Sequence, residues 1–523
     1  MKSSLFSRIC AFHAITLGSI AAYVQFTPAC SFAQSFFKGL GDLPGGDFYS
    51  NAFGVSGDGS VVVGSGKSAN GTEAFRWTES TGMVGLGDLP GGDFSSYALS
   101  VSEDGSVVVG TGSSANGSEA FRWTWMGGMS GLGGLPGGYF LSEAFDVSGD
   151  GSAVVGYSVS SKGFESFRWT EATGMVGLGD LPGGSLDSLA YGVSGDGSVV
   201  VGTGSSVNGT EAFRWTEATG MVGLGDLPGG SFNSVALGIS GDSSVAVGFG
   251  SSANGYEAFR WTESTGMVGL GDLLGGDFYS YALSVSGDSF VAVGYSSSAN
   301  GYEAFIWDSQ HGMQKVADWL TANGVSIPPG WVLEFATDVT VYKGYAIVVG
   351  HGWNPSGYHE AWIAKAPIGG VLLEPEEFLI VRGELVQGGL DDLLLSDDNK
   401  LFIKRPRSKG VTGVQIMLDV KSHFEGSSVT QLMFILESAS SEGGANQKIL
   451  FKNYQTGTFE EVDSRTATYT DSTAQVTIST NPSRFVHPQT GEVHARIVWT
   501  KTGFVPANWM TATDFVQWQV WGQ

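Results

Sequence analysis

The hydrophobic and polar positions of this chain alternate in short runs that are separated by glycine-rich turns. The second of several similar segments contains four such runs, at Met83–Leu89, Tyr97–Ser102, Ser106–Ser113 and Glu119–Thr124. Alternation with a period of two is typical of β-strands that bury one face. Turn residues, among them Asp104-Gly105 and Asn116-Gly117, separate the runs. The pattern predicts a four-stranded antiparallel meander.

The same pattern recurs every 46 residues. The most regular marker is a tryptophan, found at Trp77, Trp123, Trp169, Trp215, Trp261 and Trp307. A GDLPGG-like block and an SGDGS-like block keep the same register, so six units follow one another without insertion or deletion. An altered seventh unit ends near Glu360-Ala361-Trp362. Repeats of this kind stack because one unit alone cannot bury its hydrophobic faces.

The number of strands and units predicts the architecture. In the EAFRWT block, Phe75 and Trp77 point to one side of their strand, and Arg76 and Thr78 point to the other. Four strands in each of seven units predict an all-β fold, a seven-bladed β-propeller over residues 37–366, with an open β-solenoid as the alternative. The Asn-Gly and Asp-Gly pairs predict two-residue type I′ turns, in which both central residues have positive φ.

The EAFRWT, GDLPGG and SGDGS blocks together resemble the HAF-type bacterial extracellular repeat. The resemblance covers residues 37–366, with Glu-Ala-Phe in place of the His-Ala-Phe triplet. It implies export from a bacterial cell and a propeller-like fold, and it implies no enzyme activity. The seventh unit, with Trp353 in an HGWNPSG segment, departs from the repeat pattern.

Composition and charge exclude several classes of protein. The chain has 81 glycines in 523 residues, but no glycine recurs every third position, so it is not a collagen. Its 42% hydrophobic residues are sufficient to form a core. The net charge of −25 lies mostly in the repeats and repels phosphate backbones, so nucleic acid is excluded as a partner. This acidity has two interpretations, solubility and divalent-cation binding, and calcium is therefore the only cofactor we consider.

The N-terminus predicts export. Lys2 and Arg8 precede the mostly apolar stretch Ile9–Phe26, and small residues precede a cut after Ala33. This is the pattern of a signal peptide over residues 1–33, with a lipoprotein cut before Cys30 as the weaker alternative. After the cut at Ala33 the chain has no cysteine, and no later run of 18 apolar residues predicts a transmembrane helix. We expect a monomer that is secreted or held at the cell surface.

The composition changes after Pro367, and residues 367–372 predict a linker. Eight strand-like runs follow, at Phe378–Arg382, Lys400–Lys404, Val414–Val420, Gln431–Leu436, Lys448–Asn453, Ala474–Ile478, Val493–Trp499 and Phe515–Trp521. They predict a β-sandwich over residues 373–523. This region loosely resembles C-terminal modules of secreted planctomycete-type proteins and, more distantly, carbohydrate-binding sandwiches.

Two polar features recur in the units. One is the aspartate of the SGDGS block, found at Asp58, Asp104, Asp150, Asp196, Asp242 and Asp288. We interpret it as a turn carboxylate that accepts hydrogen bonds from nearby backbone amides, with a calcium site in each unit as the alternative. The other is the pair formed by Glu73 and Arg76 and their repeats, which predicts ion pairs across strands or between units.

Residues that break the repeat are the candidates for a ligand site. The seventh unit carries His351, Trp353 and His359, and the third unit carries Trp125 and Tyr139. The aromatic residues could stack on sugars, and the spacing of the two histidines is a weak metal or acid–base signal. Weak candidate calcium ligands in the second domain are Asp391, Asp392, Asp397 and Asp398. The sequence contains no P-loop, dinucleotide-binding fingerprint, serine elbow or cysteine nucleophile, and we assign no catalytic residue.

These observations favour a secreted, non-enzymatic repeat protein that serves as a binding or adhesion platform for an extracellular protein or glycan. The alternative is an extracellular polysaccharide-active enzyme, a hydrolase or lyase, or a carbohydrate-binding protein, with its site at the mouth of the propeller. A purely structural envelope component is a third hypothesis.

Overall fold

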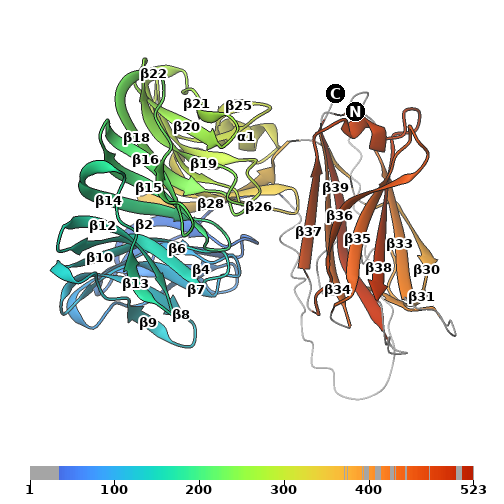
Figure 1. Ribbon diagram of the computed structural model, residues 1–523, viewed down its shortest axis with the longest axis horizontal. Coiled ribbons are helices and arrows are strands. Elements are labelled where there is room, and N and C mark those ends of the chain that lie inside the picture. The colour runs from blue at the N-terminus through green and yellow to red at the C-terminus, as the bar shows by residue number, and fades with distance from the viewer. Residues whose placement is uncertain are drawn as a thin grey trace. The chain divides into compact units, whose positions relative to one another are not determined.

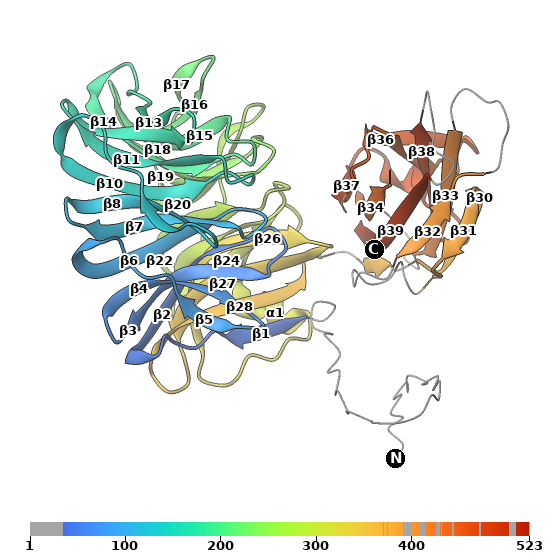
Figure 2. The same cartoon turned by 90° about the horizontal axis from the view of Figure 1, so that it is seen from below.

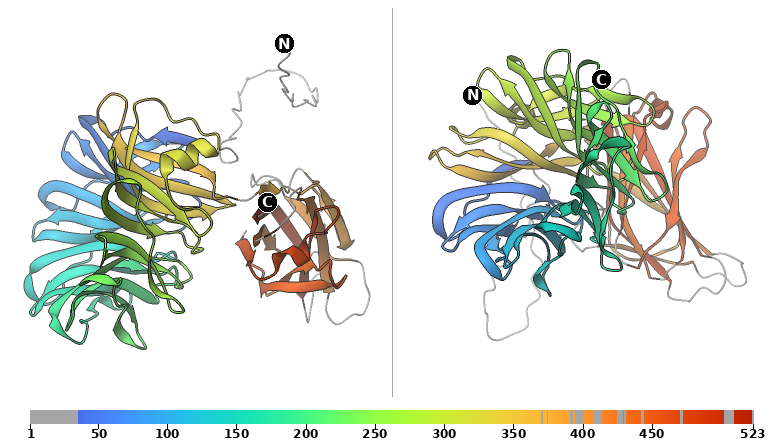
Figure 3. Two further views of the ribbon diagram at one scale, coloured as in Figure 1. Left: turned by 90° about the horizontal axis from the view of Figure 1, so that it is seen from above. Right: turned by 60° about the vertical axis from the view of Figure 1, so that its left-hand side comes forward.

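The computed structural model describes residues 35–369 and most of residues 371–521. Within the second range the exceptions are residues 374, 391–392, 394–399, 407–413, 425–428, 430, 442–443, 470–471 and 502–508. β-strands are the predominant element of the described chain, as predicted. The α-helix α1 (Val316–Ala322) packs beside β24 and β28, and its place is visible in the left view of Figure 3.

Residues 36–367 form seven groups of four antiparallel strands, coloured blue to yellow in Figure 1. The first group contains β2 (Gly45–Val55), β3 (Val61–Ser68), β4 (Gly71–Thr78) and β5 (Gly82–Gly85). The next two contain β6 (Gly91–Val101), β7 (Val107–Ser114), β8 (Gly117–Thr124) and β9 (Gly128–Gly131), then β10 (Gly137–Val147), β11 (Ala153–Ser160), β12 (Gly163–Thr170) and β13 (Gly174–Gly177). The fourth contains β14 (Gly183–Val193), β15 (Val199–Ser206), β16 (Gly209–Thr216) and β17 (Gly220–Gly223).

The remaining groups follow the same order. The fifth contains β18 (Gly229–Ile239), β19 (Ala246–Ser252), β20 (Tyr256–Thr262) and β21 (Gly266–Gly269). The sixth contains β22 (Gly275–Val285), β23 (Ala292–Ser298), β24 (Gly301–Asp308) and β25 (Gly312–Lys315). The seventh contains β26 (Val332–Tyr342), β27 (Tyr345–Trp353), β28 (His359–Pro367) and, from the start of the chain, β1 (Phe36–Gly39).

The first and last groups are joined through β1. This strand pairs antiparallel with β28, with Phe36 opposite Lys365, and the two lie side by side in Figure 2. The first strand of each group contacts the first strand of the next, and β26 contacts β2, so the seven sheets form a cycle of contacts. The boundary predicted for the first strand of each unit was wrong. The run predicted at Met83–Leu89 is the short β5, which pairs with β4 of the preceding group.

The faces of successive sheets bury one another. Val63 and Ala74 of the first sheet pack with Phe121 and Trp123 of the second. The phenylalanine of each EAFRWT-like block is fully buried, at Phe75, Phe121, Phe167, Phe213, Phe259 and Phe305. This confirms the prediction that the units stack, since neither face of a sheet is left to solvent.

The turns between β-strands differ from the predicted type I′ geometry. β7 and β8 are joined by the two-residue loop Ala115-Asn116, but Asn116 does not have positive φ. The positive φ, +130°, belongs to the following Gly117. A Cβ at Gly117 would lie 3.2 Å from the carbonyl oxygen of Phe140 in the next sheet. The backbone conformation therefore requires glycine here, and the close approach of the neighbouring sheet adds a second, weaker constraint.

The recurring aspartates act within their own turns, as predicted. The Asp104 Oδ1 accepts hydrogen bonds from the Ser106 backbone N (2.9 Å) and from the Ser102 hydroxyl (2.7 Å). The same arrangement recurs at Asp58, Asp150, Asp196, Asp242 and Asp288. Hydrogen bonds from Ser198 and Ser194 lower the pKa of Asp196, because they favour the ionised carboxylate.

The predicted ion pairs of the EAFRWT blocks are wrong. The Glu73 Oε1 accepts a hydrogen bond from the Gly87 backbone N at 3.0 Å. The Arg168 Nε donates to the carbonyl oxygen of Gly197 in the next sheet at 2.9 Å. Within residues 35–369, no ion pair joins the glutamate and arginine of one block. Backbone groups of nearby loops bind Glu73 and Arg168 instead, so the glutamate–arginine pairs that the spacing suggested do not form there. In the sixth block, Glu303 pairs with Lys315 of the neighbouring strand β25.

Two further antiparallel sheets follow residue 370. One contains β31 (Glu384–Gln387), β32 (Leu401–Lys404), β39 (Met510–Trp521), β34 (Gln431–Ser440) and β37 (Ser472–Ile478), with β29 (Val371–Leu373) beside β39. The other contains β30 (Glu377–Arg382), β33 (Val414–His423), β38 (Glu492–Lys501), β35 (Asn446–Lys452) and β36 (Phe459–Thr466). Phe434 and Trp518 from the first sheet share one core with Ile497 and Trp499 from the second. Each of the eight predicted runs overlaps one of these strands, whereas β29, β31 and β36 were not predicted.

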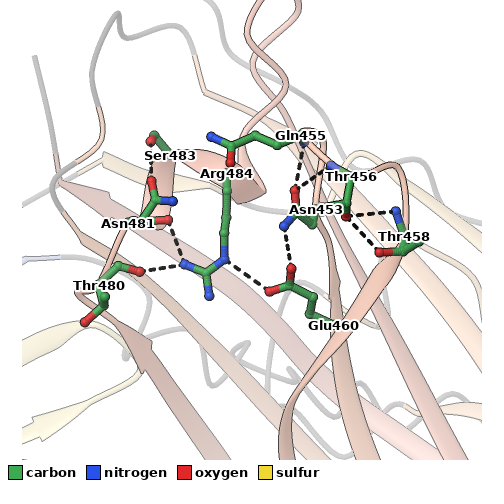
Figure 4. Close-up of polar contacts among 9 residues, drawn as sticks. All are labelled: Asn453, Gln455, Thr456, Thr458, Glu460, Thr480, Asn481, Ser483 and Arg484. Carbon is green, nitrogen blue, oxygen red and sulfur yellow. Dashed lines mark hydrogen bonds and ion pairs between the residues drawn. The ribbon is translucent and has the colours of Figure 1, made fainter.

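A polar network fastens the β35–β36 hairpin to the 3₁₀ helix η2 (Pro482–Phe485), as Figure 4 shows. The Arg484 Nε donates to Glu460 at 3.1 Å, and its Nη1 donates to the carbonyl oxygens of Thr480 and Asn481. Glu460 also accepts a hydrogen bond from the Asn453 side chain. The buried parts of this network are mutually satisfied, so its role is structural.

Candidate functional site

The structure brings together three of the five predicted ligand-binding residues. His351 on β27 and His359 on β28 have ring centroids 5.1 Å apart, and Trp353 packs edge-on against His359 at 5.3 Å. The other two lie elsewhere. Trp125 follows β8 and packs against Trp123, and Tyr139 lies on β10, where 63% of its surface is exposed. The candidate calcium ligands Asp391, Asp392, Asp397 and Asp398 lie outside the described residues.

The histidine pair is one end of a larger aromatic surface, which we call the aromatic belt. It consists of Tyr49, Phe249, Tyr256, Tyr279, Tyr281, Tyr295, Tyr302, Phe335, His351, Trp353 and His359. These side chains come from the fifth, sixth and seventh sheets and, through Tyr49, from the first. Sequence reasoning found three of the eleven.

Ring contacts run along the belt from sheet to sheet. Phe249 stacks on Tyr281 with centroids 3.8 Å apart, and Tyr281 stacks on Tyr295 at 5.2 Å. Tyr295 meets Phe335 at 4.8 Å, and Phe335 stacks on His351 at 5.0 Å. Aromatic pairs at such separations stabilise one another beyond their area of burial. The contacts therefore hold these rings in fixed orientations across sheet boundaries.

Part of the belt faces solvent. The exposed fractions are 37% for Tyr256, 46% for Tyr302, 45% for Trp353 and 39% for Tyr49. Tyr279, Tyr281, Tyr295 and Phe335 are half-buried. On the innermost strands the belt residues precede the aspartate turns: Tyr279 and Tyr281 lie in the middle of β22, and Phe335 lies near the start of β26.

Equivalent positions of the repeats hold different residues in the belt region. Tyr281 and Tyr295 face each other across β22 and β23, and the same two positions hold Leu189 and Thr203 in the fourth sheet. In the first sheet they hold Asn51 and Ser65. Aligning the seven units by register shows this variation, and that alignment is the sequence signal that would have located the belt.

Most side chains of the belt are uncharged near neutral pH. Burial and the neighbouring His359 lower the pKa of His351 to about 4, so its ring is neutral near pH 7. Burial among other tyrosines raises the pKa of Tyr281 and of Tyr295, so both hydroxyls stay protonated. The His359 Nε2 lies 3.4 Å from Glu334. Among the described residues, no group of three His, Cys, Asp or Glu side chains is placed to hold a metal ion.

A channel of about 250 Å³ runs between the innermost strands, and its wall includes two half-buried carboxylates that sequence reasoning missed. Asp146 on β10 accepts hydrogen bonds from the Ser100 hydroxyl on β6 (2.6 Å) and from the Val193 backbone N on β14 (2.8 Å). Asp338 on β26 accepts from the Ser284 hydroxyl on β22 (2.6 Å) and from the Val55 N on β2 (2.9 Å). We call this pair the inter-sheet carboxylates, because each joins three consecutive sheets.

The inter-sheet carboxylates follow a pattern in the aligned repeats. Their position reads, from the first sheet to the seventh, Gly54, Ser100, Asp146, Gly192, Gly238, Ser284 and Asp338. The order Ser, Asp, Gly therefore occurs twice around the cycle. Burial raises the pKa of Asp146 to about 7 and that of Asp338 to about 6, although their hydrogen bonds act in the opposite direction.

No protein-family model matches this chain, and no curated protein matches it. Among solved structures it is similar to putative TolB from Agrobacterium tumefaciens, with 13% identity, a TM-score of 0.32, and coverage of 51% of this chain and 89% of that one. TolB from Acinetobacter baumannii gives 13% identity, a TM-score of 0.33, and coverage of 50% and 60%. TmCBM61, solved in complex with β-1,4-galactotriose, gives 9% identity, a TM-score of 0.20, and coverage of 28% and 90%.

In the described part of the chain, every helix is too short or too polar to cross a membrane.

Proposed function

We propose that this protein is a secreted, non-enzymatic binding protein and that the aromatic belt is its ligand surface. In this proposal residues 1–33 are a signal peptide and the protein is an HAF-type repeat protein of the bacterial cell exterior. Residues 37–366 form a seven-bladed β-propeller with the belt at its mouth, and residues 373–523 form a β-sandwich.

The observation that carries the proposal is the continuity of the belt across four sheets. At the positions of Tyr281 and Tyr295, the second and third sheets have one tyrosine each, Tyr97 and Tyr157, and the fourth sheet has none. Hydrophobic packing alone does not require it, because the fourth sheet has Leu189 and Thr203 at the positions of Tyr281 and Tyr295. Partly exposed aromatic rings that are held in place form a pre-organised binding surface.

The chemistry of the belt favours a glycan as the ligand. Aromatic faces bury the C–H faces of sugar rings, and tyrosine hydroxyls supply hydrogen bonds at the edge of an apolar surface. The neutral ring of His351 and the protonated Tyr281 and Tyr295 add no charge, so an uncharged sugar chain is the best match.

An enzymatic role is the second candidate, and the histidine pair is the observation that favours it. General acid–base catalysis needs a group whose pKa lies near the working pH and that reaches the reacting atom. The low pKa of His351 makes it a poor proton donor at neutral pH. Binding without turnover therefore fits the geometry better.

A glycan array probed with the mature full-length protein tests the proposal. The variant Tyr281→Leu/Tyr295→Thr removes the centre of the belt and introduces the residues that the fourth sheet already has. We expect it to weaken binding at least 10-fold, whereas Phe164→Thr, the matched control on the third sheet, leaves binding unchanged. Absence of any bound glycan or protein ligand, or equal binding by both variants, contradicts the proposal. Turnover that is lost in His351→Ala or His359→Ala would instead establish the enzyme.

A further inference from the structure

A groove of about 560 Å³ crosses the outer face of the sheet that contains β33, β38, β35 and β36. It is formed entirely by the C-terminal region and shares no residue with the aromatic belt. Its volume lies within the range of sites that bind small molecules or a few sugar units.

Strand alternation explains how the groove is built. Ile416 and Leu418 of β33 point into the core, so Gln415 and Met417 point to the opposite face. On β38, Ile497 and Trp499 are buried in the core, and Arg496, Val498 and Thr500 line the groove. The floor is therefore an aliphatic strip of Met417, Leu450 and Val498, and it has polar side chains at its edges.

The charges in the groove are already paired. The Arg496 guanidinium donates two hydrogen bonds to Asp419, at 2.7 and 2.8 Å, and lies 4.0 Å above the ring of Phe459. Lys448 pairs with Glu461 at 2.6 Å. A charged ligand would have to displace one of these partners, since a bidentate arginine–carboxylate pair is strong and geometrically specific.

The remaining polar groups suit hydroxyl-rich partners. Gln415, Asn446 and Thr500 stand along one end of the groove, and the Gln415 amide donates to the Thr500 hydroxyl at 3.3 Å. Amides both donate and accept hydrogen bonds, as sugar hydroxyls do. The guanidinium of Arg496 has five N–H donors, of which Asp419 uses two.

We propose that this groove is a second, independent binding site, and that its ligand is an uncharged oligosaccharide. The apolar floor matches the C–H faces of sugar rings, and the amides at the edge match their hydroxyls. The charged groups of the groove are already paired, so they do not call for a charged ligand. The proposal goes beyond the function assigned to the aromatic belt, because it gives one chain two sites for sugar chains. Two linked sites bind a polymeric ligand more tightly than either does alone, where the ligand spans both.

The test uses full-length protein in which the belt has been removed by Tyr281→Leu/Tyr295→Thr. Its affinity for soluble β-glucan, xylan and galactomannan is measured by affinity electrophoresis, with polygalacturonate as the acidic comparison. We expect one of the neutral polymers to bind, and adding Gln415→Ala/Asn446→Ala to weaken that binding at least 10-fold. The control Gln455→Ala, on the exposed tip of the β35–β36 hairpin, leaves the affinity unchanged.

The outcomes separate this proposal from the previous one. Binding by the wild type that vanishes when the belt is removed contradicts the groove and leaves the belt proposal standing. Binding that survives loss of the belt but is lost with Gln415→Ala/Asn446→Ala supports the groove. The belt proposal then depends on whether the wild type binds the same polymer more tightly than Tyr281→Leu/Tyr295→Thr does, and equal affinities contradict it. Binding of polygalacturonate alone overturns the assignment to an uncharged ligand. Should Gln415→Ala/Asn446→Ala fold poorly, Leu450→Arg, which places a charge in the floor, gives the same readout.

Discussion

The aspartate turns and the aromatic belt contrast sharply. In the turns, every one of the first six repeats has the same serine and aspartate, with the same hydrogen bonds. At the belt positions the residues differ from sheet to sheet, from Asn51 and Ser65 to Tyr281 and Tyr295. Positions that all sheets need to form the fold are uniform. Positions the fold does not need are free to vary, and the aromatic side chains gather at those positions.

The inter-sheet carboxylates also break the repeat pattern, but they do so for a structural reason. They engage six of the seven sheets through Ser100, Val193, Ser284 and Val55, and only the sheet of Gly238 takes no part. Broken repeat symmetry is therefore not by itself a sign of a ligand site.

The largest expected effect concerns two glycines of the fourth sheet. A Cβ at Gly202 would lie 2.0 Å from the carbonyl oxygen of Leu189, and this atom is backbone. A Cβ at Gly220 meets nothing within 4 Å, although φ there is +66°. We expect Gly202→Ala to lower the free energy of unfolding by more than about 4 kcal/mol or to prevent folding. Gly220→Ala should cost about 1–2 kcal/mol. Urea denaturation of both variants measures the difference, and similar costs would show that the sheets are not packed as described.

The inter-sheet carboxylates and the turn aspartates should respond to pH in opposite ways. The folded-state pKa values of Asp146 and Asp338, about 7 and about 6, lie above the ordinary 3.8. The folded state therefore takes up protons between pH 4 and 7, and the free energy of unfolding falls as pH rises through that range. The pKa of Asp196 is lowered, so its contribution is present above pH 3.8 and is lost on acidification.

The variant Ser100→Gly/Asp146→Gly tests whether Asp146 causes this pH dependence. Its two glycines should fit, because Gly192 and Gly238 already occupy the same position in two consecutive sheets. We expect the increase in unfolding midpoint between pH 8 and pH 5 to shrink relative to the wild type. A midpoint that changes with pH as it does in the wild type would mean that Asp146 does not titrate in this range.

The smallest effect is expected at a single turn. Asp196→Ala removes the acceptor for the Ser198 N and for the Ser194 hydroxyl, in a turn that stands at the protein surface. The loss should be about 1 kcal/mol, because the exposed Ser198 N can bond to water instead, while the buried Ser194 hydroxyl loses its acceptor. Thermal unfolding monitored by tryptophan fluorescence measures it. A loss of several kcal/mol would indicate a role beyond the turn.

Much of the fold follows from the 46-residue period. The period predicts the stacked sheets, the buried phenylalanines and the aspartate turns, because these depend on residues that recur in every unit. It does not predict that β1 completes the seventh sheet, since the short strand before Leu40 reads as the start of the first unit. The turn at Asn116 and the pairing of Glu73 were also wrong, because both depend on backbone groups of neighbouring segments.

The site was harder to predict than the fold. His351, Trp353 and His359 stood out because they break the pattern of the seventh unit, but Tyr281 and Tyr295 lie in units that otherwise keep the repeat. Asp338 was hidden by the longer seventh unit, because it lies 54 residues after its equivalent Ser284 and not 46. Only the strand register places these residues in the same positions.

The claim that the aromatic belt binds a glycan is tested most directly by isothermal titration calorimetry. One glycan that binds on the array is titrated into the wild type, Tyr281→Leu/Tyr295→Thr and Phe164→Thr, and the three dissociation constants are compared. We expect a dissociation constant at least 10-fold higher for the belt variant and an unchanged value for the third-sheet variant. Dissociation constants within twofold of one another for all three proteins would contradict the claim.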